Sequence, residues 1–220
     1  MALARRKPNS EHERRDTPKD ATHDFHRSRP EAIDCLLSIE RAALQRYRAI
    51  CEGACGAGDL VRPLRRAGFD VVASDVIDRG CPNGIVADFL DPKAFARLPL
   101  PPRAAQRAFV SNPPFNLDDE FILAATQRFD YVAMLLRLRY LAPFHLIDAF
   151  GDGIKRAIWT STRIPFARIV LPNHRWKTMH REGYTGPKTD SGTIDFCWFI
   201  WEQGHTGSPR ILRQPPRGRQ

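Results

Sequence analysis

The chain has 220 residues and a mass of 25.0 kDa; 42% of the residues are hydrophobic and 27% are charged. This composition is typical of one soluble globular domain. The longest apolar runs, 131–136 and 196–201, are far shorter than the roughly 18 residues that a membrane-spanning helix needs. The N-terminus lacks the apolar stretch of a secretory signal, and the five cysteines show no C-x-x-C spacing. We therefore expect a cytoplasmic protein without a disulfide framework or a zinc ribbon.

The elements follow one another as short apolar segments separated by turn residues. The expected elements are, in chain order, helix 30–47, strand 47–51, helix 60–67, strand 69–74, strand 85–87, strand 108–111, helix 117–129, strand 131–136, helix 146–160, strand 168–171 and strand 194–201. Residues 24–203 thus form one domain. The polar segment 1–23 and the Pro- and Arg-rich segment 204–220 are expected to be disordered.

Recurring strand, turn and helix predict a parallel sheet flanked by helices. In such sheets the ligand lies beyond the carboxyl ends of the strands. The unusual residues of this chain stand at the carboxyl ends of the expected strands. They are a glycine-rich turn at 53–58, Asp75, Asp88 and the tetrapeptide 112–115. The sequence therefore predicts a single site at one edge of the sheet.

The glycine-rich turn follows an acidic residue, Glu52. The turn does not match G-x-G-x-x-G or a P-loop, and a carboxylate suits a ligand that carries an ammonium group rather than a pyrophosphate. Glycines allow a backbone to approach a ligand closely. Asp75 can accept hydrogen bonds from both ribose hydroxyls, Asp88 can accept one from an adenine amino group, and Phe89 can lie against the ring. An ammonium, a ribose and an adenine together describe S-adenosylmethionine.

The order of these segments carries a resemblance to a known family. Residues 52–60, 71–75 and 111–115 resemble the corresponding segments of class I S-adenosylmethionine-dependent methyltransferases, and more narrowly the phage and prophage amino-methyltransferases that carry an N-P-P-[YF] motif. The similarity runs from about Asp24 to Trp201. It implies a Rossmann-like α/β fold with a mostly parallel, seven-stranded sheet whose last strand is antiparallel. The chain departs from the family in segment 24–30, where arginines stand in place of prolines. In the family this segment helps to hold the cofactor, and Ser28 and Pro30 are the candidates to keep that role here.

The expected cofactor is S-adenosylmethionine. The residues expected to bind it are Glu52, Gly53, Ala54, Gly56, Gly58, Asp75, Asp88, Phe89 and Asn112.

The tetrapeptide Asn112, Pro113, Pro114 and Phe115 supplies the expected catalytic residues. The exocyclic amine of adenine is a weak nucleophile because its lone pair is delocalised into the ring. Two acceptors, the Asn112 side-chain oxygen and the Pro113 carbonyl, can bind both N–H groups and localise that pair. Phe115 offers a ring on which a base can stack, worth about 1–3 kcal/mol. Direct attack on the methyl group then needs positioning rather than a metal or a covalent intermediate.

A second set of residues is expected to bind nucleic acid. The formal charge of +9 is concentrated at residues 155–188, where eight basic side chains stand against one acidic one, as suits a polyanionic partner. Aromatic rings alternate with these cations, which favours phosphate contact and base stacking. The residues concerned are Arg175, Trp176, Lys177, Arg181, Tyr184 and Lys188. His174, His180 and Asp190 match no metal signature, and no metal is expected.

These observations predict transfer of a methyl group to the N6 amine of adenine in DNA. Enzymes that modify a base must extrude it or use single strands, and the chain has no room for a large target-recognition domain. Methylation of RNA adenine or of a protein glutamine side chain stays open, because both chemistries use the same tetrapeptide. A non-catalytic scaffold that binds nucleic acid is the alternative from another class.

Overall fold

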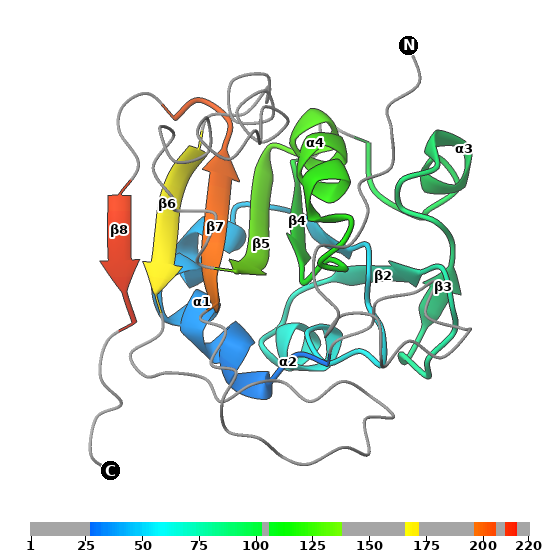
Figure 1. Ribbon diagram of the computed structural model, residues 1–220, viewed down its shortest axis with the longest axis horizontal. Helices are drawn as coiled ribbons and strands as arrows, with labels where there is room; N and C mark the ends of the chain where they lie inside the picture. Colours follow the sequence, from blue (N-terminus) through cyan, green and yellow to red (C-terminus); the bar gives the residue numbers. More distant parts are fainter. Residues whose placement is uncertain (1–26, 103–105, 138–165, 172–195, 206–209, 215–220) are drawn as a thin grey trace, which may run out of the picture.

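A computed structural model describes residues 27–102, 106–137, 166–171, 196–205 and 210–214 (Figure 1). None of the helices in these ranges is long and apolar enough to cross a membrane. The elements are α1 (Pro30–Leu44), β1 (Ala49–Glu52), α2 (Val61–Arg66), β2 (Val71–Asp75), β3 (Gly84–Val86), α3 (Pro92–Phe95), β4 (Arg107–Ser111), α4 (Asp118–Arg128), β5 (Tyr131–Arg137), β6 (Phe166–Leu171), β7 (Phe196–Glu202) and β8 (Arg210–Arg213).

All the described strands belong to one sheet in the order β3-β2-β1-β4-β5-β7-β6-β8 (Figure 1). Neighbouring strands from β3 to β5 run parallel, and β7 runs antiparallel to both β5 and β6. This mostly parallel sheet with an antiparallel β7 confirms the predicted Rossmann-like fold. The sheet has eight strands rather than the expected seven.

The additional strand, β8, corrects a second expectation. It lies within the segment 204–220 that we expected to be disordered, and it pairs in parallel with β6 from Arg168–Arg210 to Leu171–Arg213. The segment has only two apolar residues, Ile211 and Leu212, among arginines and prolines, so its own pattern does not predict a strand. Its hydrogen bonds come from the exposed edge of β6, a contact between distant parts of the chain. The last strand in the chain is therefore parallel to its neighbour.

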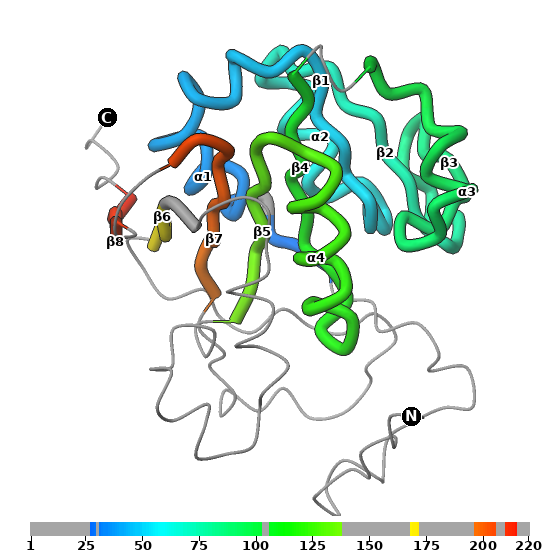
Figure 2. Tube along the Cα trace, turned by 90° about the horizontal axis from the view of Figure 1, so that it is seen from above, coloured from blue at the N-terminus to red at the C-terminus, as the bar shows by residue number. Residues whose placement is uncertain are grey.

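Helices cover both faces of the sheet, with α1 and α2 on one face and α4 on the other (Figure 2). Alternate residues of β5 and β7 point to opposite faces: Tyr131, Ala133 and Leu135 join the cluster under α1 and α2, whereas Val132, Met134 and Leu136 join the cluster under α3 and α4. Both faces of these strands are buried, which explains why their sequences are continuously apolar.

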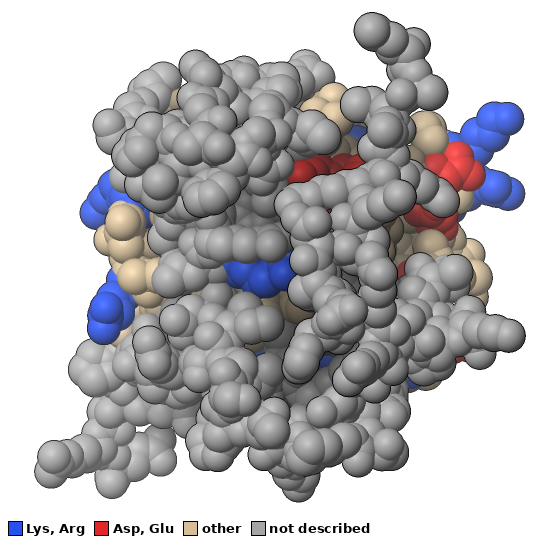
Figure 3. Space-filling view, viewed as in Figure 1, with Lys and Arg blue, Asp and Glu red and all other residues tan. Residues whose placement is uncertain are grey.

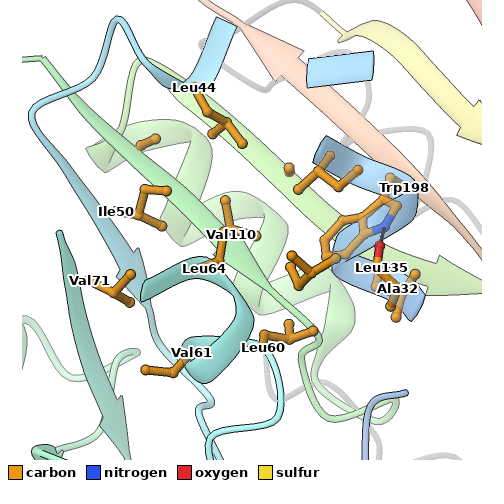
Figure 4. Close-up of a cluster of buried hydrophobic side chains, with 14 of the residues drawn as sticks. Ala32, Leu44, Ile50, Leu60, Val61, Leu64, Val71, Val110, Leu135 and Trp198 are labelled. Carbon is orange, nitrogen blue, oxygen red and sulfur yellow. Dashed lines mark hydrogen bonds between the residues drawn. The ribbon is translucent and has the colours of Figure 1, made fainter. Parts of the chain in front are cut away.

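The helix α1 is fixed to the sheet at its first turn. The Trp198 indole Nε1 donates a hydrogen bond of 2.8 Å to the carbonyl oxygen of Ala32, inside the cluster that also holds Leu60, Leu64 and Val110 (Figure 4). The buried indole has a partner for its N–H, as buried tryptophans usually require. The first turn of α1, and the residues just before it, are thereby held at the carboxyl ends of the strands.

Three predicted features lie outside the described residues: the segment 1–23, the helix expected at 146–160 and most of the basic region 155–188.

Candidate functional site: a cleft at the carboxyl ends of the strands

The cleft lies where β1, β2 and β4 end. It contains about 460 Å³ of space not filled by protein atoms, and part of this space is open solvent. Its lining comes from the segment before α1, the turn after β1, the end of β2 and the turn after β4. The lining residues are Ser28, Glu52, Ala54, Cys55, Asp59, Leu60, Asp75, Asn112, Pro113 and Pro114. Glu52, Ala54, Asp75 and three residues of the tetrapeptide were predicted to meet at one site, and they line one cleft.

Glu52 is a buried carboxyl group without a cation in the described part of the chain. Its side chain is 1% exposed, and its Oε1 accepts hydrogen bonds from the Ser111 hydroxyl at 2.6 Å and from the Ala54 backbone N–H at 3.0 Å. Burial raises the pKa of Glu52 to about 8, and the negative charge of Asp75 adds to this rise, while the two hydrogen bonds oppose it. No lysine or arginine of the described residues forms an ion pair with it. A ligand cation would supply the missing partner.

The turn after β1 is held to the end of β2. The Gly56 N–H donates to Asp75 Oδ2 at 2.8 Å, and the Cys55 N–H donates to the Ser74 carbonyl at 2.9 Å. Gly56 and Gly58 have positive φ values of 50° and 84°, which explains glycine at both positions. The turn therefore has a fixed shape before any ligand binds.

Gly53 packs tightly against two aromatic rings. A Cβ atom at this position would lie 2.7 Å from Phe89 Cγ and 3.0 Å from Phe109 Cε2. The glycine is therefore required by the aromatic cluster beneath the sheet. That its backbone also approaches the cofactor stays a prediction.

Asp75 lies on the cleft, but its predicted companions Asp88 and Phe89 do not. The Asp75 carboxylate accepts from the Gly56 and Ile77 N–H groups, which leaves about two of its roughly four acceptor positions for hydroxyl groups. Asp88 is exposed and accepts from the Leu90 N–H at 2.8 Å. Phe89 is 1% exposed and packs on Phe109 and Phe121 with ring centroids 4.6 and 5.1 Å away. The Phe89 side chain therefore belongs to the core, and the expectation that it lies against an adenine ring is wrong.

Asn112 contacts a residue that lies 84 positions earlier in the chain. Its Nδ2 donates to the Ser28 hydroxyl oxygen at 2.9 Å, and the side chain is 9% exposed. The neighbouring Arg27 binds both carboxylate oxygens of Asp59, at 2.8 and 3.1 Å. Residues 27 and 28 therefore connect the turn after β1 with the turn after β4. The sequence pointed to Ser28 only through the family resemblance.

Phe115 is half-buried beside the cleft and already has aromatic and cationic neighbours. Its ring stacks on Phe196 with centroids 5.4 Å apart, and the Arg137 guanidinium lies 4.9 Å from its centroid. Arg137 also donates to the Phe115 carbonyl at 3.1 Å and lies 3.7 Å from Asp118 Oδ2. A base stacked on Phe115 must share the ring with this guanidinium or displace it.

Three further residues line the cleft that were not among the expected site residues. Cys55, Asp59 and Leu60 line the cleft, although glycine-rich turns give no sign of which side chains face inward. Burial raises the pKa of the Cys55 thiol above its usual range, and the nearby carboxyl of Glu52 adds to the rise, so the thiol stays protonated and is a poor nucleophile.

The residues predicted to bind nucleic acid, from Arg175 to Lys188, lie outside the described residues. On the face shown in Figure 3, the described lysines and arginines stand in separate places at the margins and near the centre. Within the described ranges, no three His, Cys, Asp or Glu side chains are grouped as metal ligands.

Comparison with known proteins identifies the fold. No family model matches the chain, and no curated protein sequence is similar to it. Among solved structures, a proposed RNA methyltransferase from Pyrococcus horikoshii is similar with a TM-score of 0.53 and 15% identity, over 85% of this chain and 90% of that one. An S-adenosylmethionine-dependent methyltransferase from Archaeoglobus fulgidus is similar with a TM-score of 0.50 and 11% identity, over 79% of this chain and 94% of that one. The chain has the fold of class I methyltransferases.

Proposed function

We propose that the protein uses S-adenosylmethionine to methylate the N6 amine of adenine in DNA. The observation that carries the proposal is that two features line the same cleft: Glu52, a buried carboxyl without a cationic partner among the described residues, and the first three residues of the tetrapeptide that begins at Asn112. The first suits the donor's ammonium, and the second suits a planar amine. The resemblance to phage amino-methyltransferases favours DNA among the possible polymers.

The cleft residues fit the proposed cofactor. Glu52 is the counter-ion for the α-ammonium group, and Asp75 accepts hydrogen bonds from the ribose hydroxyls. The glycine-rich turn between them is held in place by the bond from Gly56 to Asp75, so little ordering is needed on binding. When bound, the cofactor supplies a methyl group on a sulfonium, which is an electrophile that needs no metal.

The tetrapeptide positions the acceptor. The side-chain oxygen of Asn112 and the carbonyl of Pro113 accept the two N–H groups of the amine, and they thereby direct its lone pair toward the methyl carbon. An amine nitrogen held in this way would accept the methyl group that the bound cofactor supplies, and it would release one proton to water after the transfer. Phe115 and Arg137 form the border on which the base rests.

Transfer of a radiolabelled methyl group tests the proposal. The protein is incubated with labelled S-adenosylmethionine and, in separate reactions, with double- and single-stranded DNA, RNA and a glutamine-bearing protein. The expected product is N6-methyldeoxyadenosine, identified by mass spectrometry of the digested DNA. Label found only in RNA or only in protein would show that the substrate is that polymer and not DNA. Binding of DNA without any methyl transfer would favour a non-catalytic scaffold that binds nucleic acid.

A further inference from the structure

Ser111 is a fully buried residue whose hydroxyl contacts the carboxyl group of Glu52. It is the last residue of β4, and it is 0% exposed. Its Oγ lies 2.6 Å from Glu52 Oε1. The next residue along the chain is Asn112. The hydroxyl therefore connects the two features of the cleft on which the proposed function rests.

The two oxygens of the Glu52 carboxyl group have different surroundings. Oε1 accepts two hydrogen bonds, from the Ser111 hydroxyl and from the Ala54 backbone N–H at 3.0 Å. Within the described residues, no donor binds Oε2, and Glu52 lines the cleft. The carboxyl group is thus held by one oxygen, and the other oxygen is left for a ligand cation.

The contact with Ser111 favours the ionised form of Glu52. A hydroxyl group can donate or accept a hydrogen bond, but opposite an ionised carboxylate it can only donate, because that group has no hydrogen. A hydrogen bond to a charged group is about twice as strong as one between neutral groups. Burial raises the pKa of Glu52 to about 8, and the hydrogen bonds from Ser111 and Ala54 oppose this rise.

The other titratable groups near Glu52 supply no cation. They are one carboxyl group and three thiols, those of Asp75, Cys51, Cys55 and Cys81. The negative charge of Asp75 raises the pKa of Glu52, and burial raises the pKa of each thiol. Asp59, which also lines the cleft, has its own cation in Arg27. Of the described side chains, Ser111 alone donates a hydrogen bond to Glu52.

We propose that Ser111 is a positioning residue for cofactor binding, which holds Glu52 by one oxygen so that the other oxygen meets the ligand ammonium as an anion. This inference rests on the proposed function, in which Glu52 is the counter-ion of the cofactor. Ser111 acts through Glu52 and need not touch the ligand. Without the hydroxyl, the buried carboxyl group would hold its proton more tightly, and binding of a cation would have to release that proton at a greater cost in affinity.

The test measures how the affinity of Ser111→Ala depends on pH. S-adenosylhomocysteine, which carries the same α-amino group as the proposed cofactor, is titrated calorimetrically into the natural chain and the variant at pH 7 and pH 9. We expect the variant to bind about tenfold more weakly at pH 7, the effect of one hydrogen bond to a charged group. At pH 9 the loss should be only about twofold, because the carboxyl group is ionised to a much larger extent there. The ligand's own amino group titrates equally with both proteins, so it does not change the ratio of their dissociation constants.

Ser111→Cys is a second variant, and it keeps the size of the side chain with a weaker donor. Its affinity at pH 7 should lie between those of the natural chain and Ser111→Ala.

Ser74→Ala is the matched control. Ser74 is also fully buried near the end of a strand, just before the cleft residue Asp75, but its hydroxyl has no hydrogen-bond partner within the described residues. The control should leave the affinity unchanged at both pH values. A loss from Ser111→Ala that is equally large at pH 7 and pH 9, or no loss at either, overturns this inference while the proposed function stands. If the natural chain binds no S-adenosylhomocysteine, the proposed function fails and this inference fails with it.

Discussion

Buried acidic groups at the two ends of the sheet differ in their partners. At the amino ends of the parallel strands, Glu40 is 2% exposed and is bound by Arg168 at 2.7 and 2.8 Å and by the Tyr131 hydroxyl at 3.1 Å. Burial acts to raise the pKa of the nearby Glu202, but hydrogen bonds and charges of Arg168 and Arg46 outweigh it and hold that pKa below its usual value. At the carboxyl ends, burial raises the pKa of Glu52 to about 8.

The difference in partners indicates different roles for the buried acidic groups at the two ends of the sheet. A buried carboxylate costs free energy unless it is paired, and the chain supplies arginines for Glu40 and Glu202. It supplies none for Glu52 within the described residues, although the side chain faces a cleft. The carboxyl groups at the amino ends have their partners without a ligand, whereas we propose that Glu52 gains its partner when a ligand cation binds.

The largest effect is expected at the amino end. Arg168→Met removes the cation from Glu40 and should lower the free energy of unfolding by about 3–5 kcal/mol, because a buried charge loses its partner. The measurement is urea denaturation at pH 7. Arg46→Gln is the control: it breaks the ion pair of an exposed arginine with Glu202 and should cost no more than about 1 kcal/mol. Similar costs for the two variants would contradict the structural role given to the buried pair.

A large effect on activity is expected from Asn112→Ala. Loss of the acceptor oxygen should reduce the rate of methyl transfer by about a hundredfold or more, while the affinity for S-adenosylmethionine changes little and stability is that of the natural chain. Single-turnover transfer and calorimetry measure the two quantities. Parallel loss of rate and cofactor affinity would mean that Asn112 belongs to the cofactor's half of the cleft.

A smaller, pH-linked effect is expected from Glu52. A carboxyl with a pKa of about 8 is mostly protonated at pH 7, and a bound ammonium favours its charged form. Binding of S-adenosylmethionine should therefore release close to one proton at pH 7, and affinity should rise between pH 6 and pH 7.5. Calorimetry in buffers of different ionisation enthalpy counts the proton. Glu52→Gln should weaken binding about tenfold and should abolish the release; release from both proteins would place the titrating group elsewhere.

The sequence predicts most of the sheet because its local signals agree with its long-range packing. The apolar runs of β5 and β7 match strands that are buried on both faces, and Glu52, Asp75 and Asn112 meet because parallel strands place their ends together. What local patterns miss depends on contacts between distant segments. The bond from Ser28 to Asn112 spans 84 residues, and β8 exists through its pairing with β6. The expected contact of Phe89 with an adenine ring is wrong because the sequence pattern of an aromatic residue after a strand does not indicate whether its ring faces a ligand or the core.

The most direct measurement of the central claim is a crystal structure of the protein with S-adenosylhomocysteine or S-adenosylmethionine. We predict that the ammonium lies within hydrogen-bond distance of Glu52, the ribose lies at Asp75 and the sulfur faces the tetrapeptide at Asn112. Density for the ligand at another surface, or a cleft beside Glu52 that stays empty at saturating ligand, would contradict the account.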